Sequence, residues 1–489
     1  MIDLTKHEDK LQNTVKRARE RGIVIPTFEQ MKDPALIPAS VKEGLKEHGL
    51  WDLHPLNLFR ISWKNEPVLQ GGGFGNVNYI EFPSELTGVN ARIIALVGKW
   101  FPTGAHKVGA TFGCLVPRLV TGQFDPTFHN AVWPSTGNFC RGGAYNSALL
   151  GCDSIAILPE GMSKERFEWL AEVAGEVIAT PGSESNVWEI FQKCKELQAT
   201  RDNVMIFDQF EEFGNHLWHY DVTGHAMAEV LDKELKGGRY AGVVLTSGSG
   251  GTMGCGDYLK EQYPGSKLIA SEALQCPTML ENGFGSHRIE GIGDKHIPWI
   301  HNARNTDFVT AIDDEDPMHL IRLFNDPAGK KHLQSLGMSA DYIDQLELLG
   351  ISGVANMLSA IKFAKHNELT GSDVVLTVLT DSMEMYGTRL AELNDEFGPY
   401  NETQAAVDHS RHLLGIKTDS MQELGYQERK RIHNLKYFTW IEQMGLSPDE
   451  LDRQWYDYDA YWGNIHSMVP EIDKLIVEFN EAVGLENKG

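Results

Sequence analysis

A short apolar run meets a glycine-rich loop at Val243-Val244-Leu245-Thr246-Ser247-Gly248-Ser249-Gly250-Gly251-Thr252, and a helix-forming stretch follows at 253–261. An unbroken apolar run of this length is typical of a buried strand. Glycines let successive backbone N–H groups face one point, and the N-terminus of the next helix adds partial positive charge there. We therefore predict a strand, a phosphate-binding turn and a helix. A plain tight turn that needs positive φ angles is the open alternative.

The same unit recurs along the chain from about residue 90. Short apolar runs, each followed by a stretch with helical periodicity, lie at 92–97, 131–133, 154–158, 176–179, 204–207, 242–246, 267–270 and 373–379. Alternating strands and helices predict an α/β fold with mostly parallel sheets and helices on both faces. Such folds bind ligands beyond the carboxyl ends of their strands, so the strand-to-helix loops are where a site is expected.

The α/β pattern occupies the middle of the chain. We expect a helical N-terminal extension at 1–52, a core at 53–400 and a helical C-terminal region at 401–489. Within the core, we expect a smaller mobile domain at about 92–215, with the larger domain in the rest and a polar helical insertion at about 314–349.

No strand is expected after about residue 400. Helices are expected there at 426–443, 447–456 and 461–483. Tryptophan and tyrosine are prominent among their apolar positions, which suits a packing layer or a contact between subunits.

Composition narrows the class of protein. The chain has 489 residues, of which 42% are hydrophobic and 23% charged, as in ordinary globular proteins. The net charge of −24 argues against nucleic-acid and anionic-membrane partners, so an anionic ligand must be held by local donors. No apolar run approaches the roughly 20 residues that span a bilayer. The polar N-terminus also lacks the apolar segment of a signal peptide.

Cysteine and histidine spacing gives no sign of a metal. The six cysteines stand singly, without a CxxC pair, which predicts a cytoplasmic protein in a reducing compartment. His216, His219 and His225 are close in sequence but share no helical face with a carboxylate. We therefore expect no metal site.

Three further loops carry residues suited to chemistry. Lys107, in Pro102-Thr103-Gly104-Ala105-His106-Lys107-Val108-Gly109, is expected one turn into a helix, where the dipole favours the neutral amine. Ser135-Thr136-Gly137-Asn138 opens another helix and suits a carboxylate. In Thr380-Asp381-Ser382, the Ser382 hydroxyl suits a pyridine nitrogen. A solvated lysine and plain helix caps are the open alternatives. In this order, the loops suggest a phosphorylated aromatic cofactor joined to Lys107 as a Schiff base.

A dinucleotide site is a rival interpretation of the glycine loop. Glu272 ends the next expected strand, where a ribose-binding acid belongs. Against this, the dinucleotide pattern needs glycine at position 253, which is Met253, and the N-terminal half lacks the usual first βαβ unit. An NAD-dependent dehydrogenase is therefore kept only as the alternative from a different class.

Several further segments carry a family likeness. They are His54-Pro55-Leu56, Leu158-Pro159-Glu160-Gly161-Met162, Asp208-Gln209-Phe210, His219-Tyr220-Asp221-Val222-Thr223-Gly224 and His287-Arg288-Ile289-Glu290-Gly291-Ile292-Gly293. With the glycine loop and the end of the last strand, they give a chain that resembles the fold-type II pyridoxal-phosphate enzymes, nearest to cysteine synthase and cystathionine β-synthase. The lysine segment Thr-Gly-Ala-His-Lys is instead similar to that of tryptophan synthase β.

The resemblance implies a role for each candidate residue. Lys107 would be the Schiff-base lysine and the proton shuttle at Cα, and Asn138 would bond the 3-oxygen of the cofactor. The phosphate would be bound by Gly248, Ser249, Gly250, Gly251 and Thr252, and the pyridine nitrogen by Ser382. The substrate carboxylate would be held by Ser135, Thr136 and Gln209.

The resemblance also implies a reaction class. We expect pyridoxal-phosphate-dependent β-elimination or β-replacement through an aminoacrylate, on a small β-substituted L-amino acid such as serine, O-acetylserine or a cysteine-like compound. A neutral hydroxyl at the pyridine nitrogen makes a weaker electron sink than a protonated ring, which favours prompt elimination. The alternative is a deaminating lyase, of the dehydratase, desulfhydrase or diaminopropionate ammonia-lyase type. The resemblance further implies a homodimer.

Overall fold

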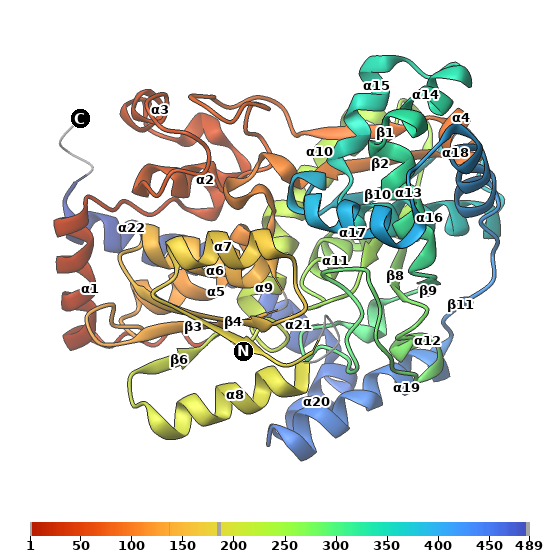
Figure 1. Ribbon diagram of the computed structural model, residues 1–489. Helices are drawn as coiled ribbons and strands as arrows, with labels where there is room; N and C mark the ends of the chain where they lie inside the picture. The colour runs from red at the N-terminus through yellow and green to blue at the C-terminus, as the bar shows by residue number, and fades with distance from the viewer. Residues whose placement is uncertain (1, 136, 183–186, 486–489) are drawn as a thin grey trace.

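Two sheets organise the chain in the computed structural model, which describes residues 2–135, 137–182 and 187–485 (Figure 1). Within these ranges, one sheet has seven strands in the order β1-β2-β10-β7-β8-β9-β11 and the other has four in the order β5-β4-β3-β6. The seven strands are β1 (Tyr79–Phe82), β2 (Arg92–Val97), β7 (Arg239–Thr246), β8 (Lys267–Ala273), β9 (Phe308–Ile312), β10 (Asp373–Leu379) and β11 (Met421–Glu423). The four strands are β3 (Asn130–Pro134), β4 (Asp153–Pro159), β5 (Glu176–Thr180) and β6 (Val204–Ile206).

Both sheets are mainly parallel. The smaller sheet pairs all its strands in parallel, and the larger sheet is antiparallel only at its two edges, where β1 pairs β2 and β11 pairs β9. The interior strand β10 is buried along its whole length, as expected of a parallel strand that helices cover on both faces. The predicted α/β class is therefore confirmed.

Helices cover the sheets and extend beyond them at both ends of the chain. The N-terminal ones are α1 (Glu8–Arg21), α2 (Phe28–Lys32) and α3 (Ala39–Leu45). Those of the central region are α4 (Ser84–Thr87), α5 (Lys107–Val120), α6 (Asn138–Leu149), α7 (Lys164–Val173), α8 (Val187–Thr200), α9 (Phe213–Trp218), α10 (Gly224–Glu234), α11 (Met253–Gln262), α12 (Thr278–Glu281), α13 (Glu315–Asn325), α14 (Pro327–Ser335), α15 (Ala340–Gln345), α16 (Ile351–His366) and α17 (Gly387–Phe397). The C-terminal ones are α18 (Glu402–Asp408), α19 (Tyr426–Lys436), α20 (Pro448–Tyr456), α21 (Tyr458–His466) and α22 (Val469–Val483).

The two ends of the chain meet. Helix α22 lies beside α1 in Figure 1, and the Arg19 guanidinium donates hydrogen bonds to the carbonyls of Ala482 and Val483. Helix α22 also packs against α5, where Ile476 and Phe479 join the same apolar cluster as Leu115. The C-terminal region therefore supports the helix that begins at Lys107.

The C-terminal region differs from the prediction in two ways. The expected helix at 461–483 is divided into α21 and α22, because a turn intervenes and Pro470 follows it, where proline suits the first turn of a new helix. The short strand β11 also joins the edge of the large sheet, although no strand was predicted after residue 400. Its polar sequence, Met421-Gln422-Glu423, carries no strand pattern.

The segment 314–349 is helical, as predicted, but it is not a surface appendage. Helix α13 has a buried apolar face that packs against α16. No single helix in the described ranges is long and apolar enough to cross a membrane; only the bent pair Ala340–Leu348 and Ile351–His366 passes that test, and only when both halves are counted together.

Candidate active site

A pocket lies beyond the carboxyl ends of strands from both sheets. Its lining includes the N-terminus of α5, the loops after β3 and β6 of the small sheet, and the loops after β7 and β10 of the large sheet. Parallel strands end at the same sheet edge, so residues far apart in the sequence converge there. Among the predicted site residues, those in the lining are Lys107, Ser135, Asn138, Gln209, Gly248, Ser249, Gly250 and Thr252.

Lys107 is the first residue of α5, so the helix begins at the lysine and not one turn before it as predicted. Its Nζ donates a hydrogen bond of 2.8 Å to the hydroxyl of Ser249 in the glycine loop. Burial lowers the pKa of Lys107 from 10.5 to about 8, and the carboxylate of Asp294 partly opposes this shift. A sizeable fraction of neutral amine is therefore present at mildly alkaline pH, as a nucleophilic lysine requires.

Two glycines of the loop after β7 are packed too tightly to carry a side chain. A methyl group at Gly248 would lie 2.5 Å from the Gly291 carbonyl oxygen, and one at Gly251 would lie 1.9 Å from Oδ1 of Asn215. Gly250 has a φ of +75°, which favours glycine. Helix α11 begins immediately after the loop, so its N-terminal N–H groups face the same region. Gly251 is outside the lining and forms the back of the loop.

The residues predicted to bind the substrate carboxylate lie close together, among those that the structure describes. The amide nitrogen of Gln209 donates to the Ser135 hydroxyl at 3.3 Å, and that hydroxyl also accepts the N–H of Gly137 at 3.2 Å. Thr136 is outside the described residues. Two chain segments that follow different strands thus meet at one polar corner of the pocket.

Asn138 connects the pocket to a buried polar network. Its amide nitrogen donates to Oδ2 of Asp381 at 2.7 Å, and its Oδ1 has no hydrogen-bond partner among the described residues. Tyr386 donates to the same carboxylate oxygen at 2.8 Å, and Arg166 lies 3.9 Å from it. Burial raises the pKa of Asp381, while Arg166 opposes the shift. Asp381 therefore orients Asn138.

The two hydroxyl residues that follow β10 lie in different surroundings. Thr380 lines the pocket, and its Oγ1 lies 3.3 Å from Nε2 of His106, whereas Ser382 is buried outside the lining. Ser382 instead precedes the short 3-10 helix Met383–Met385. The choice between two hydroxyls in Thr380-Asp381-Ser382 depends on where the strand ends, which the sequence alone leaves uncertain by a residue or two.

Two ionisable residues in the lining were missed. Asp294 follows the predicted 287–293 segment, and burial raises its pKa to about 7, which the ammonium of Lys107 opposes. His106 precedes Lys107, and burial lowers its pKa to about 3, so its ring is neutral. His106 lies within the predicted lysine segment, and Asp294 directly follows the segment 287–293, so their positions in the sequence were the available signal.

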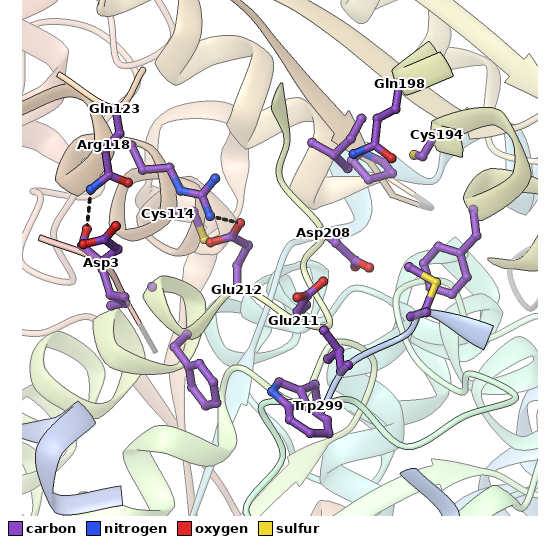
Figure 2. A pocket seen from close by; sticks show the side chains of 18 of the residues that line it. Asp3, Cys114, Arg118, Gln123, Cys194, Gln198, Asp208, Glu211, Glu212 and Trp299 are labelled. Carbon is purple, nitrogen blue, oxygen red and sulfur yellow. Dashed lines mark hydrogen bonds and ion pairs between the residues drawn. The ribbon is translucent and has the colours of Figure 1, made fainter. Parts of the chain in front are cut away.

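A second cavity, of about 480 Å³, adjoins the segment after β6 (Figure 2). The carboxyl groups of Asp208 and Glu211 point into it, and Arg118 pairs with Glu212 at 2.6 Å. Burial raises the pKa of Asp208 to about 8, so this carboxyl is mostly neutral at physiological pH. Asp208 lines this cavity while its neighbour Gln209 lines the first, so the segment separates the two.

The comparisons with known proteins agree with this geometry. The family described as "Pyridoxal-phosphate dependent enzyme" matches residues 101–381, and the chain belongs to this family. A probable cysteine synthase of Bacillus subtilis is 29% identical over 299 residues, which are 61% of this chain and 89% of the relative. Cystathionine beta-synthase of Saccharomyces cerevisiae is 24% identical over 62% of this chain, which spans only 59% of that relative.

Solved structures share the fold. The O-acetylserine dependent cystathionine beta-synthase from Helicobacter pylori has a TM-score of 0.54 and 24% identity, over 63% of this chain and 94% of the other. A hydrogen sulfide-producing enzyme from Fusobacterium nucleatum has a TM-score of 0.52 and 25% identity, over 65% and 88%. The fold-type II assignment is therefore confirmed.

The residues of the pocket fit pyridoxal 5'-phosphate. A buried lysine with a lowered pKa faces a glycine loop at a helix N-terminus, and a buried amide oxygen on Asn138 lacks a partner in the described structure. The protein is thus a cysteine synthase-like, pyridoxal-phosphate-dependent enzyme of the lyase or transferase type. The dinucleotide alternative is set aside, because the family match includes the glycine loop.

Proposed function

We propose that this enzyme removes or replaces the β-substituent of a small L-amino acid of the serine or O-acetylserine type. The observation that carries the proposal is the Lys107 amine, buried and 2.8 Å from the serine of the glycine loop. The similarity to cysteine synthases supports the substrate class.

Lys107 has two roles in this proposal. Its amine binds the cofactor, and once released it takes the proton from the substrate Cα. When bound, pyridoxal phosphate supplies the electron sink for that step. Asp294 faces Lys107, and its carboxylate favours the ammonium form, so it regulates how readily the lysine gives up the proton it has taken.

The other residues hold and orient. We propose that Gly248, Ser249, Gly250 and Thr252 bind the phosphate through N–H and O–H groups, with Gly251 shaping the loop. Ser135, Thr136 and Gln209 hold the substrate carboxylate, and Asn138, fixed by Asp381, meets the 3-oxygen. Thr380 takes the place at the pyridine nitrogen that was expected for Ser382. Its neutral hydroxyl leaves that nitrogen unprotonated, which disfavours transamination.

A lyase without a second substrate is the other candidate. The name of the Fusobacterium nucleatum structure, a hydrogen sulfide-producing enzyme, favours it. Both candidates share the removal of the β-substituent and differ in the next step, which is either attack by a nucleophile or release and hydrolysis to a keto acid and ammonia.

The test is to supply serine, O-acetylserine, cysteine, threonine and diaminopropionate, each with and without sulfide or a thiol. A new thioether or cysteine that depends on the nucleophile supports the synthase, and a keto acid formed without it supports the lyase. Lys107→Ala should abolish both products and the adduct trapped by borohydride, and Lys164→Ala, on an exposed helix end, is the control. If no substrate loses its β-substituent, the proposal is wrong.

Assembly and compartment are part of the proposal. We propose a homodimer, supported by exposed aromatic side chains on the C-terminal helices, among them Tyr426, Phe438 and Tyr456. A mass in solution near 54.6 kDa, that of a single chain, would contradict it. The six cysteines are all unpaired, which supports a reducing, cytoplasmic setting that fractionation of cells can test. We also propose that residues of about 92–215, within the core 53–400, form a smaller mobile domain. The four-stranded sheet lies within this segment.

A further inference from the structure

Three buried ligand-type side chains meet outside the pocket. His216 is on α9, Asp257 on α11, and His466 is the last residue of α21. Nε2 of His216 lies 3.0 Å from Nε2 of His466, and Oδ2 of Asp257 lies 3.7 Å and 3.9 Å from these two atoms. Their side chains are 0%, 2% and 9% exposed, in the order His216, Asp257, His466. Figure 1 places the three helices side by side.

These distances leave room for one ion at normal bond lengths. A triangle with sides of 3.0, 3.7 and 3.9 Å has a circumscribed radius of about 2.1 Å, so one point lies at that distance from all three atoms. Zinc binds imidazole nitrogen at about 2.0–2.1 Å and carboxylate oxygen at about 2.0–2.2 Å. We propose that His216, Asp257 and His466 bind a divalent transition-metal ion, zinc above all, with a water molecule as the remaining ligand.

The surroundings hold two of the three ligands in place. Asn302 donates to Oδ2 of Asp257 at 2.9 Å, which orients the carboxylate. Glu261, one helical turn after Asp257, lies 3.4 Å from Nδ1 of His466 and accepts a hydrogen bond of 2.6 Å from Tyr220. A carboxylate behind a ligating histidine directs the proton to Nδ1 and leaves the Nε2 lone pair for the metal.

The short contact between the two histidines has two alternative explanations. In the first, both Nε2 lone pairs face one cation and each ring carries its proton on Nδ1. In the competing arrangement there is no metal, and the Nε2–H of one ring donates a hydrogen bond to Nε2 of the other.

The site connects the C-terminal region to the cofactor loop. His216 follows Asn215, whose amide donates to the Ser249 hydroxyl at 3.0 Å, and α11 begins directly after the glycine loop. A metal ion here would attach α21 to both elements. The sequence could not indicate this group, because His216 and His466 are 250 residues apart. The proposal revises the expectation of no metal.

The experiment measures metal in tag-free holoenzyme. After purification without added metal, elemental analysis should find about one zinc per chain. Protein stripped with dipicolinate should bind one Co²⁺ with the visible d–d bands of a low-coordinate site, and its melting temperature should rise on binding. A zinc content near zero together with no cobalt bands would overturn the proposal and favour the direct hydrogen bond between the two rings.

Variants assign the metal to these residues. His466→Gln should lose the cobalt bands, whereas His433→Gln, another buried histidine of the C-terminal helices, should keep them. Glu261→Gln should bind Co²⁺ about 10- to 100-fold more weakly while leaving the ligands intact, so it serves if His466→Gln fails to fold. His412→Gln tests the other His–Asp group, His319, Asp408 and His412. Bands that persist in His466→Gln or vanish in His412→Gln would also overturn the assignment.

Discussion

Replacement of Asp294 by asparagine should shift the pH at which Lys107 captures its cofactor. Among the described residues, Asp294 has the strongest of the charge effects that oppose burial at the Lys107 amine. Removal of its negative charge destabilises the ammonium form, so the pKa of Lys107 should fall below about 8 in Asp294→Asn.

Burial has a large effect on the reactivity of this amine. At about pH 7.5, a lysine with a pKa of about 8 is about one quarter neutral, whereas a lysine at 10.5 is about one thousandth neutral. The amine of Lys107 should therefore react roughly 200-fold faster with pyridoxal phosphate than a solvated lysine of equal intrinsic reactivity.

The assay uses apoenzyme mixed rapidly with pyridoxal phosphate across a pH series, with the covalent bond read by absorbance and fixed with borohydride. The capture rate should rise with pH to a midpoint near 8 in the parent enzyme and at lower pH in Asp294→Asn. Asp313→Asn is the control and should leave the midpoint in place, because Asp313 is outside the pocket lining and is not among the groups that shift the pKa of Lys107. A parent midpoint near 10.5, or an upward shift in Asp294→Asn, would refute the reasoning.

Three further predictions concern single contacts. Gly251→Ala should lower the free energy of unfolding in urea by about 1–3 kcal/mol, because the added methyl group meets Asn215. Gly463→Ala has open space around the added methyl group and should be neutral or stabilising. Equal effects of the two substitutions would contradict this prediction. Thr380→Ala should change the absorbance of the bound cofactor and lower kcat, and Ser382→Ala should do neither; the reverse result would restore the sequence assignment. Ile476 is fully buried on α22, so Ile476→Ala should lower the free energy of unfolding by about 2–5 kcal/mol. Its neighbour Val477 is exposed, and Val477→Ala should change that free energy by no more than about 0.5 kcal/mol. A similar loss in both variants would contradict the packing of α22 on α5.

The elements that carry the site were predictable because their signals are local. A run of apolar residues that ends in glycines, as at 243–252, indicates a strand, a turn and a helix without reference to the rest of the chain. The same holds for Lys107 and for the loop that contains Asn138. What failed were boundaries: the start of α5 and the division between α21 and α22. Boundaries depend on which backbone groups find partners, and the partners are distant.

The sequence by itself determined the α/β class, the cofactor and several of the residues that line the pocket. Only the tertiary structure decided which of these residues meet: Lys107 against Ser249, Asn138 against Asp381, and His216 against Asp257 and His466. The physical reason is the separation along the chain. Periodicity and turn chemistry act over a few residues, whereas these contacts form when two parallel sheets and a C-terminal helix pack together, and burial then sets the pKa values that the chemistry uses.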